Sequence, residues 1–322
     1  MKLSIIIVSW NVKDDVLNCL KSIRMHPPRH PYEVIVVDNS STDGTVDAIK
    51  TKFAGVTVIA NNTNRGFAAA NNQGIIVAQG QYLLLLNPDT LVHPGSLDTL
   101  IEFMENNQDV GICGPKILNT DGTTYHSVKR IVTFRGVLYG KTILRFFGVF
   151  RGHYRKLKPY DFNYRKQAEV KCLSGAALMV RRSVIDQVGW MDERFFMYYE
   201  DVDLCLRIKK LGQRIVFVPE AVITHIGGKS SAGLSTKRRI MEYRSLLIYL
   251  RKHKGRFRTA LFNLIFKPAA IIGEAASVFS SVISYLFCVF LCNRQKRLKS
   301  LFKIKDSVDF LLLYSWQFLF KA

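Results

Sequence analysis

An α/β fold, with a mostly parallel central sheet flanked by helices and a helical C-terminal region, is predicted by three observations. Short apolar runs alternate with segments of helical spacing through residues 1–90, which is the order of elements that builds a parallel sheet. Each of these runs ends in polar residues on its C-terminal side. From about residue 233 onward, basic segments and long apolar segments replace this alternation.

The strands are predicted from short apolar runs without alternation, which are typical of strands buried on both faces. Such runs cover Leu3–Val8, Val34–Val37, Val56–Ala60 and Tyr82–Leu86, and later Ile112–Pro115, Ala176–Val180 and Arg214–Val218, where Pro219 ends the last one. Helical spacing separates the first four runs, at Val16–Ile23, Val46–Ile49 and Phe67–Val77. The basic segment 129–171 is interpreted as a variable loop or lid, and the small residues Ser174–Ala177 would let a substrate approach the backbone.

Polar residues follow each of the first four strands. They are Ser9-Trp10-Asn11, Asp38-Asn39-Ser40, Asn61-Asn62 and Asn87-Pro88-Asp89. Any one of these groups could simply be a turn, because turns favour such residues. Four in succession at the carboxyl ends of parallel strands favour a ligand site. The first strand lacks GxGxxG and the chain lacks GxxxxGK[ST], so dinucleotide dehydrogenases and P-loop enzymes are disfavoured.

A second polar cluster contains three carboxylates, Glu200, Asp201 and Asp203. Acidic residues also favour the first turn of an ordinary helix, and the spacing after them is helical. The aromatic run Phe195–Tyr199 directly before them would place the carboxylates beside an apolar wall. Because like charges in such a place repel, the pattern favours a general base or a cation site.

Length and charge divide the chain. A chain of 322 residues with 48% hydrophobic content predicts a catalytic domain at 1–232 and an appendage at 233–322. This domain would consist of two halves, at about 1–115 and about 116–232. Residues 1–128 carry 9 Lys and Arg against 12 Asp and Glu, a net of −3, whereas residues 129–322 carry 37 against 13, a net of +24.

The basic C-terminal region interleaves charge with aliphatic residues, which favours a bilayer surface over nucleic acid. A basic amphipathic helix is predicted at Ser235–Lys254, and apolar segments at 261–266 and 275–292 lie between two basic runs. The sequence leaves open whether 268–292 spans the membrane, forms a buried helix pair or anchors at the interface. We expect a peripheral, monotopic or weakly spanning protein.

The catalytic part is expected to stay in the cytoplasm. The apolar run Leu3–Val8 is too short for a signal peptide. Six cysteines without a CxxC pair indicate buried thiols in a reducing compartment.

Taken together, these motifs resemble those of the family-two inverting glycosyltransferases with the GT-A fold, and most closely their rhamnosyltransferase-like bacterial branch. The resemblance covers about residues 1–255 and preserves the order of the motifs. The matching pieces are Ser4–Asn11, Val36–Thr45, Asn64–Asn72, Leu85–Asp89, Tyr199–Cys205 and His225–Gly228.

The resemblance implies that the half at about 1–115 binds the nucleotide sugar and the half at about 116–232 binds the acceptor. It also implies a role for each donor-side residue. Asp38 would bind the pyrimidine base, while Ser9, Trp10, Asn11, Asn39, Arg65, Asn87 and Asp89 would lie around the nucleotide and its phosphates. The family's DxD motif is Asn87-Pro88-Asp89 here, so Asp89 is its one carboxylate. His225 resembles a second metal ligand, although a histidine can also be an ordinary core or surface residue. Asp89 and His225 would hold Mg²⁺ or Mn²⁺.

The resemblance also implies that Asp201 is the catalytic base that removes the acceptor hydroxyl proton. Glu200 and Asp203 would orient the acceptor or the basic groups around it, and the sequence leaves Asp203 open as an alternative base. The expected enzyme is a hexosyltransferase on the cytoplasmic face of the bacterial inner membrane. It would transfer L-rhamnose from dTDP-rhamnose to a lipid-linked or polysaccharide acceptor in cell-surface glycan synthesis.

Two alternatives remain at this stage. A UDP-hexose or UDP-galactofuranose could be the donor, or the chain could be a non-catalytic glycan- or lipid-binding scaffold. The expected partners are the nucleotide sugar, the acceptor and the membrane surface, with no nucleic acid, while homo-oligomerisation is left open. The linkage position is not determined by the residue pattern.

Overall fold

The computed structural model describes residues 1–129, 131–145, 147–152, 162–227, 235–290, 294–315 and 318. These residues form two compact units. Unit 1 comprises Met1–Ile131 and Pro159–Ser230, and unit 2 comprises Val132–Lys158 and Ser231–Ala322. Gly228 and residues 291–292, which belong to two of the sequence patterns above, lie outside the described residues.

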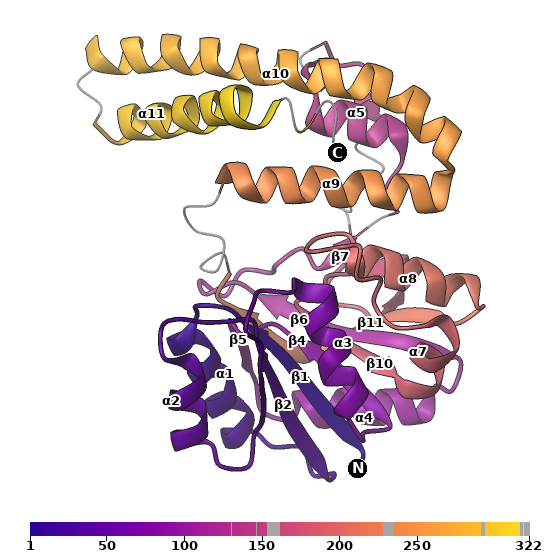
Figure 1. Ribbon diagram of the computed structural model, residues 1–322. Helices are drawn as coiled ribbons and strands as arrows, with labels where there is room; N and C mark the ends of the chain where they lie inside the picture. Colours follow the sequence, from indigo (N-terminus) through magenta and orange to yellow (C-terminus); the bar gives the residue numbers. More distant parts are fainter. Residues whose placement is uncertain are drawn as a thin grey trace. The chain divides into compact units, whose positions relative to one another are not determined.

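Unit 1 is built on a mixed sheet in the order β3-β2-β1-β4-β10-β6-β11-β5, with β8 paired to β11 (Figure 1). Its strands are β1 (Leu3–Ser9), β2 (Tyr32–Asp38), β3 (Thr57–Ala60), β4 (Tyr82–Leu86), β5 (Thr90–Val92), β6 (Val110–Leu118), β8 (Ala168–Glu169), β10 (Ala177–Arg181) and β11 (Arg214–His225). Strands β7 (Val128–Lys129) and β9 (Cys172–Leu173) form a small separate pair.

Helices cover both faces of this sheet. They are α1 (Lys13–Met25), α2 (Thr45–Lys52), α3 (Phe67–Val77), α4 (Ser96–Asn106), α7 (Arg182–Val188) and α8 (Glu200–Lys210). Apolar residues of α1, α2 and α4 pack with alternate residues of the central strands into one core. Helix α3 packs on the opposite face, where Gly74 lies so close to Ile6 that a Cβ atom would come within 2.5 Å of its side chain.

The parallel pairing aligns the polar strand ends. β1 pairs with β2 in a register that sets Ser9 opposite Asp38, and β2 pairs with β3 so that Asp38 lies opposite Ala60. On the other side, Ile7 lies opposite Leu86, the last residue of β4. The residues that follow these strands therefore emerge at one edge of the sheet, as the sequence predicts.

Two strands depart from the simple pattern. β10 runs antiparallel between β4 and β6, which makes the sheet mixed. β11 does not end at Pro219 but continues to His225, with a shift of register between Val218 and Val222 where it pairs with β6. A bulge of this kind tolerates proline because the affected residue leaves the hydrogen-bond ladder. The extra length carries His225 to the edge where the polar strand ends emerge.

Unit 2 is helical. It contains α5 (Phe134–Lys141), the short 3₁₀ turn η1 (Ile143–Arg145), α9 (Ser235–Lys254), α10 (Arg256–Phe290), α11 (Arg294–Asp309) and the π-helical turn η3 (Phe310–Tyr314). Aromatic side chains form its core, in which Tyr243 of α9 contacts the rings of Phe266, Phe310 and Phe318. The two apolar segments of the sequence, as far as Phe290, belong to one helix, α10, which continues through Pro268.

Candidate active site

The loops that follow β1 and β2 are joined by side-chain hydrogen bonds. Ser9 Oγ donates to Asp38 Oδ2 at 2.9 Å, and Ser41 donates to the same carboxylate through its N–H at 2.8 Å and its hydroxyl at 2.6 Å. Asn11 donates its N–H to Ser41 Oγ and accepts at Oδ1 from the N–H of Thr42. Asp38 is buried, so these bonds hold its carboxylate at the edge of the sheet.

Asn39 connects this edge to the start of α3. Its side-chain amide donates to the carbonyl of Gly66 at 3.1 Å, and its Oδ1 accepts from Asn61 and from the backbone of Arg65. The Arg65 side chain is exposed and Trp10 is half-buried. The structure therefore brings all the predicted donor residues that follow β1 and β2, together with Arg65, into one set of connected loops.

A carboxylate and an imidazole meet at the ends of β5 and β11. His225 lies opposite Thr90 in the antiparallel pair, and Ile226 donates its N–H to the carbonyl of Asp89 at 2.8 Å. This register places His225 Nε2 3.1 Å from Asp89 Oδ1 and 3.4 Å from Asn87 Nδ2. Both side chains are nearly buried, at 12% and 9% exposure.

This pair fits a hard divalent cation, because a carboxylate with one imidazole suits Mg²⁺ or Mn²⁺. Among the described residues, no three His, Cys, Asp or Glu side chains gather to bind a metal ion. Asp89 and His225 would thus supply two ligands, and oxygens from a substrate would have to supply others.

The acidic cluster begins helix α8, after an unusual turn. Tyr198 and Tyr199 both have left-handed backbone conformations, with φ of 73° and 68°. Such conformations cost about 1–3 kcal/mol each in residues with side chains, and they cluster at functional sites. The turn directs Glu200 and Asp201 into the protein, where both are buried.

Asp201 is held at both carboxylate oxygens. Its Oδ2 accepts from the N–H of Gly175 at 2.9 Å and from Lys129 Nζ at 2.7 Å, while Oδ1 accepts from the N–H of Val202 at 2.8 Å. A Cβ atom on Gly175 would lie 3.3 Å from the Cβ atom of Asp201, a tight contact that would displace this side chain by a few tenths of an ångström.

Backbone contacts link Asp201 to the carboxylate–imidazole pair. Gly175, which donates to Asp201, precedes Ala176, whose carbonyl accepts from the N–H of Asn87 at 3.0 Å. The side-chain amide of Asn87 in turn lies beside His225. The base candidate and the metal candidates therefore border the same short stretch of backbone at the end of β10.

Glu200 is buried and lacks a hydrogen-bond partner at one carboxyl oxygen among the described residues. It is 6% exposed, and the oxygen concerned is Oε2. Burial, followed by the neighbouring charge of Asp201, raises the pKa of Glu200 to about 8. The uncharged form of Glu200 is therefore favoured to a higher pH than that of an ordinary glutamate.

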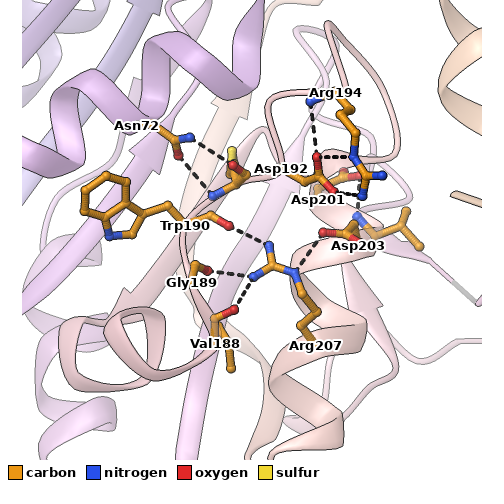
Figure 2. A network of polar contacts seen from close by, with 11 residues as sticks. Asn72, Val188, Gly189, Trp190, Asp192, Arg194, Asp201, Asp203 and Arg207 are labelled. Atoms are coloured by element: carbon orange, nitrogen blue, oxygen red, sulfur yellow. Dashed lines mark hydrogen bonds and ion pairs between the residues drawn. The ribbon is translucent and has the colours of Figure 1, made fainter. Parts of the chain in front are cut away.

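Asp203, in contrast, forms a buried ion pair. Figure 2 shows its carboxylate paired with Arg207, and the Nε atom of Arg207 lies 2.8 Å from Asp203 Oδ2. The same guanidinium donates to the carbonyls of Val188, Gly189 and Trp190. Asp203 is fully buried, so its charge is committed to holding the loop that precedes α8.

Helix α3 fixes the same loop from the other side. The Asn72 side chain bonds both the carbonyl and the N–H of Met191 (Figure 2). At the start of α3, Phe67 donates its N–H to the carbonyl of Phe196 at 2.7 Å, next to Gly66. The donor-side loop and the loop that carries the base candidate are thus in direct contact.

Sequence reasoning did not predict the contacts of four residues in this arrangement, which are Lys129, Gly175, Asn72 and Arg207, although Gly175 and Asn72 lie in segments that it singled out. Arg207 could have been paired with Asp203 from its i,i+4 spacing. Lys129 and Asn72 reach their partners across 72 and 119 residues, respectively, and nothing in the local pattern indicates such contacts.

Relatives with known functions match most of the chain. The N-acetylglucosaminyl-diphospho-decaprenol L-rhamnosyltransferase of Mycobacterium tuberculosis strain H37Rv is 30% identical over 279 residues, which are 80% of this chain and 87% of the relative. The rhamnosyltransferase WbbL of Escherichia coli K12 is 25% identical over 261 residues, covering 78% and 93% of the two chains.

Solved structures share the fold. A mannosyltransferase from Pyrobaculum calidifontis, determined with GDP-Man and Mn²⁺, matches 97% of this chain and 87% of its own with a TM-score of 0.56 and 18% identity. GalNAc-T7, determined with UDP, GalNAc and Mn²⁺, matches 70% and 44% with a TM-score of 0.54 and 18% identity. These likenesses confirm the predicted GT-A type of α/β fold.

The sequence model of glycosyl transferase family 2 matches residues 4–189, which are more than half of the chain and contain the donor-side loops and Asp89. Together with the relatives, this match confirms the predicted enzyme class and the rhamnosyltransferase-like resemblance. The chain belongs to glycosyl transferase family 2.

Proposed function

We propose that the chain transfers L-rhamnose from dTDP-rhamnose to a lipid-linked or polysaccharide acceptor, with inversion at the anomeric carbon. The observation that carries the proposal is the contact chain from Asp201 through Gly175 and Asn87 to His225. The similarity to two rhamnosyltransferases supports the sugar, and the polyprenyl-diphosphate name of one of them supports the acceptor class.

On the donor side, Asp38 would bind the pyrimidine base. Its carboxylate already accepts from Ser9 and Ser41, which would orient it toward a base N–H. Trp10, Asn11, Asn39 and Arg65 would surround the nucleotide, and the exposed guanidinium of Arg65 suits a diphosphate.

Asp89 and His225 would hold a divalent cation, with Asn87 beside them. Bound there, Mg²⁺ or Mn²⁺ would stabilise negative charge on the departing nucleoside diphosphate. The 3.1 Å approach of the two side chains supports a shared ligand.

Asp201 would be the base. Oδ1 accepts one hydrogen bond, so it keeps a lone pair for the acceptor hydroxyl proton. As that proton moves to Asp201, the acceptor oxygen bonds to the anomeric carbon and the bond from this carbon to the diphosphate oxygen breaks. The Lys129 and Gly175 contacts would orient the carboxylate. Asp203 is a weaker candidate because its charge is paired with Arg207.

Glu200 would act differently, as a neutral acid that can donate a hydrogen bond to an acceptor oxygen. Its buried and unpartnered Oε2 supports this orienting role. The expected location is the cytoplasmic face of the bacterial inner membrane, where a lipid-linked acceptor would be available.

A panel of nucleotide sugars, tested with purified protein and a polyprenyl-diphosphate-linked acceptor, tests the donor. Transfer from dTDP-rhamnose with the opposite anomeric configuration is expected. Transfer only from a UDP-hexose or UDP-galactofuranose would replace the proposed donor while keeping the reaction. No transfer from any donor would favour a glycan- or lipid-binding scaffold.

The Asp201→Asn variant tests the base. It should lose transfer by about a thousandfold while it still binds the donor nucleotide, because general base catalysis contributes on this scale. Full turnover by this variant would remove Asp201 from the base role.

A further inference from the structure

Helix α10 presents one continuous apolar face to its surroundings. Within Arg256–Cys288, which is long and apolar enough to cross a membrane, only 11% of the most apolar window is buried. The outer stripe is defined by Phe257, Leu261, Leu264, Ile272, Phe279 and Leu286, whose exposure ranges from 50% to 75%. Their spacing follows the helical period, so they lie along one side of the helix.

On another side of α10, charged side chains form ion pairs with the neighbouring helices. Glu274 pairs with Arg239 of α9 and accepts a hydrogen bond from Ser307 of α11 at 3.0 Å. Arg239 also pairs with Asp306 of α11 at 2.8 Å. All three charged side chains are at most 22% exposed. This triad ties the middle of α10 to both neighbouring helices.

The triad opposes a transmembrane position for α10. Glu274 lies near the centre of the helix, so a spanning α10 would place it near the middle of the bilayer. Either the ion pairs would break and leave Glu274 alone in hydrocarbon, or α9 and α11 would enter with it. Both outcomes are costly, because charged residues at the bilayer centre cost about 3 kcal/mol each or more.

Helix length alone permits either orientation. The 35 residues of α10 extend for about 52 Å, whereas the hydrocarbon core is about 30 Å thick. Figure 1 shows α11 returning alongside α10, and this packed helix bears the exposed cations Lys296, Arg297, Lys299 and Lys303. Anionic headgroups would complement these charges.

We propose that the α10–α11 hairpin lies flat in the surface of an anionic bilayer, with the outer stripe in the acyl boundary, and does not cross it. This inference deepens the proposed function, since it defines how the enzyme would meet a lipid-linked acceptor. The occupant of the apolar face is therefore the lipid bilayer itself, and the long basic side chains would reach the headgroups around it.

Flotation of the full chain with vesicles tests the surface. The protein should float with phosphatidylglycerol-containing vesicles and much less with pure phosphatidylcholine. Replacing Phe257, Leu264 and Phe279 by serine should weaken binding by at least about a hundredfold, since three large apolar side chains would no longer be buried. Ile76→Ser, at an apolar residue of α3 that is 59% exposed, is the matched control and should leave flotation unchanged.

Depth measurements distinguish a flat helix from a spanning one. Tryptophan placed at Phe257, Ile272 or Phe287 should be quenched by lipids brominated at one shallow depth, with the wild-type protein as the blank. Deep quenching at residue 272 alone, with the two ends shallow, would overturn the proposal. Equal flotation of the triple-serine variant would overturn it as well.

Failure of the membrane proposal can be separated from failure of the proposed function. The triple-serine variant should still transfer sugar to a short, water-soluble acceptor. Asp201→Asn should float as the wild-type protein does while it lacks transfer.

Discussion

At the start of α8, three carboxylates within four residues meet three different environments. Asp201 accepts from two backbone N–H groups and Lys129, Asp203 is paired with Arg207, and Glu200 is buried with an unpartnered oxygen. The sequence predicts that these acids are functional but leaves Asp203 open as the base. The environments differ because Lys129 and Gly175 reach Asp201 from distant parts of the sequence, whereas Asp203 meets Arg207 one turn along the same helix.

Glu200 should make stability depend on pH. Its pKa is about 8 in the folded protein against an ordinary 4.5, because burial and then Asp201 disfavour the charged form. Its contribution is fully present below about pH 4.5 and is lost as pH rises through about 8. Glu200→Gln should therefore gain stability relative to the wild type over this range, by on the order of a few kcal/mol.

Thermal unfolding of both proteins at pH 5 and pH 8 checks this expectation. The difference in Tm should move in favour of the variant at the higher pH. The same change at the exposed Glu220 is the matched control. A constant difference for Glu200→Gln would show that this acid does not ionise as we infer.

Asp203 should matter for stability before it matters for catalysis. Asp203→Asn removes the charge that balances Arg207 and should cost about 3 kcal/mol, the scale for breaking a buried ion pair. Asp192→Asn is the control, because its partner Arg194 is 63% exposed and such pairs contribute at most about 1 kcal/mol. Chemical denaturation measures both. An Asp203→Asn protein of normal stability but without transfer would instead support Asp203 as the base.

At the scale of elements, α3 connects the donor loops to the base loop. Gly66 caps this helix with φ of 86°, and a Cβ atom there would lie 2.6 Å from the carbonyl oxygen of Phe196. The sequence pattern predicts α3, and the family resemblance implies that Arg65 binds the donor, but neither indicates this contact.

Gly66→Ala should therefore weaken donor binding and lower stability together. Gly44→Ala is a close control, because Gly44 also has a positive φ, 78°, but open space around it. Both changes should cost about 1 kcal/mol for the left-handed backbone, and only Gly66→Ala should cost more. Nucleotide titration and thermal unfolding measure the difference, and equal effects would mean that the Phe196 contact is dispensable.

Elements with strong local patterns are predicted well. The first four strands and the helix Ser235–Lys254 agree with the sequence to within two residues at their ends. The predicted end of β11 at Pro219 was wrong. Proline usually ends a strand, but here pairing with β6 and β5 resumes beyond it. The sequence analysis also treated α10 as two separate apolar segments, because Lys267 and Pro268 interrupt the apolar run. In the structure the helix continues through both residues.

For the whole molecule, the sequence places one boundary near residue 232, whereas Val132–Lys158 also belongs to the helical unit. Helix α5 lies in this insertion and packs in unit 2, where the ring of Phe134 lies 4.8 Å from that of Phe262 and Lys141 pairs with Glu242 at 2.6 Å. A chain cut after residue 230 would lack Phe262 and Glu242, the partners of α5.

Such a truncation should aggregate or bind a hydrophobic dye. Its apolar residues Phe134 and Val137 would lose their cover, and replacing both by serine in the truncated chain should reduce dye binding. Light scattering and dye fluorescence measure the two proteins. A well-behaved 1–230 fragment with unchanged dye binding would show that α5 does not depend on unit 2.

Sugar transfer should require a divalent ion. Chelation should stop transfer, and added Mn²⁺ or Mg²⁺ should restore it. His225→Ala should require a higher ion concentration, since it removes one of two protein ligands. Undiminished transfer in excess chelator would contradict the metal role of Asp89 and His225.

By itself, the sequence determined the α/β class, the family and the polar strand ends, because these depend on local periodicity and on motifs contiguous along the chain. The tertiary structure decided which partners meet each carboxylate of α8 and which histidine meets Asp89. It also packed α5 into the helical unit, and it placed Glu274 with its partners Arg239 and Asp306 on the side of α10 away from the outer stripe. Those outcomes depend on strand register and on contacts between residues distant in sequence, which no local pattern encodes.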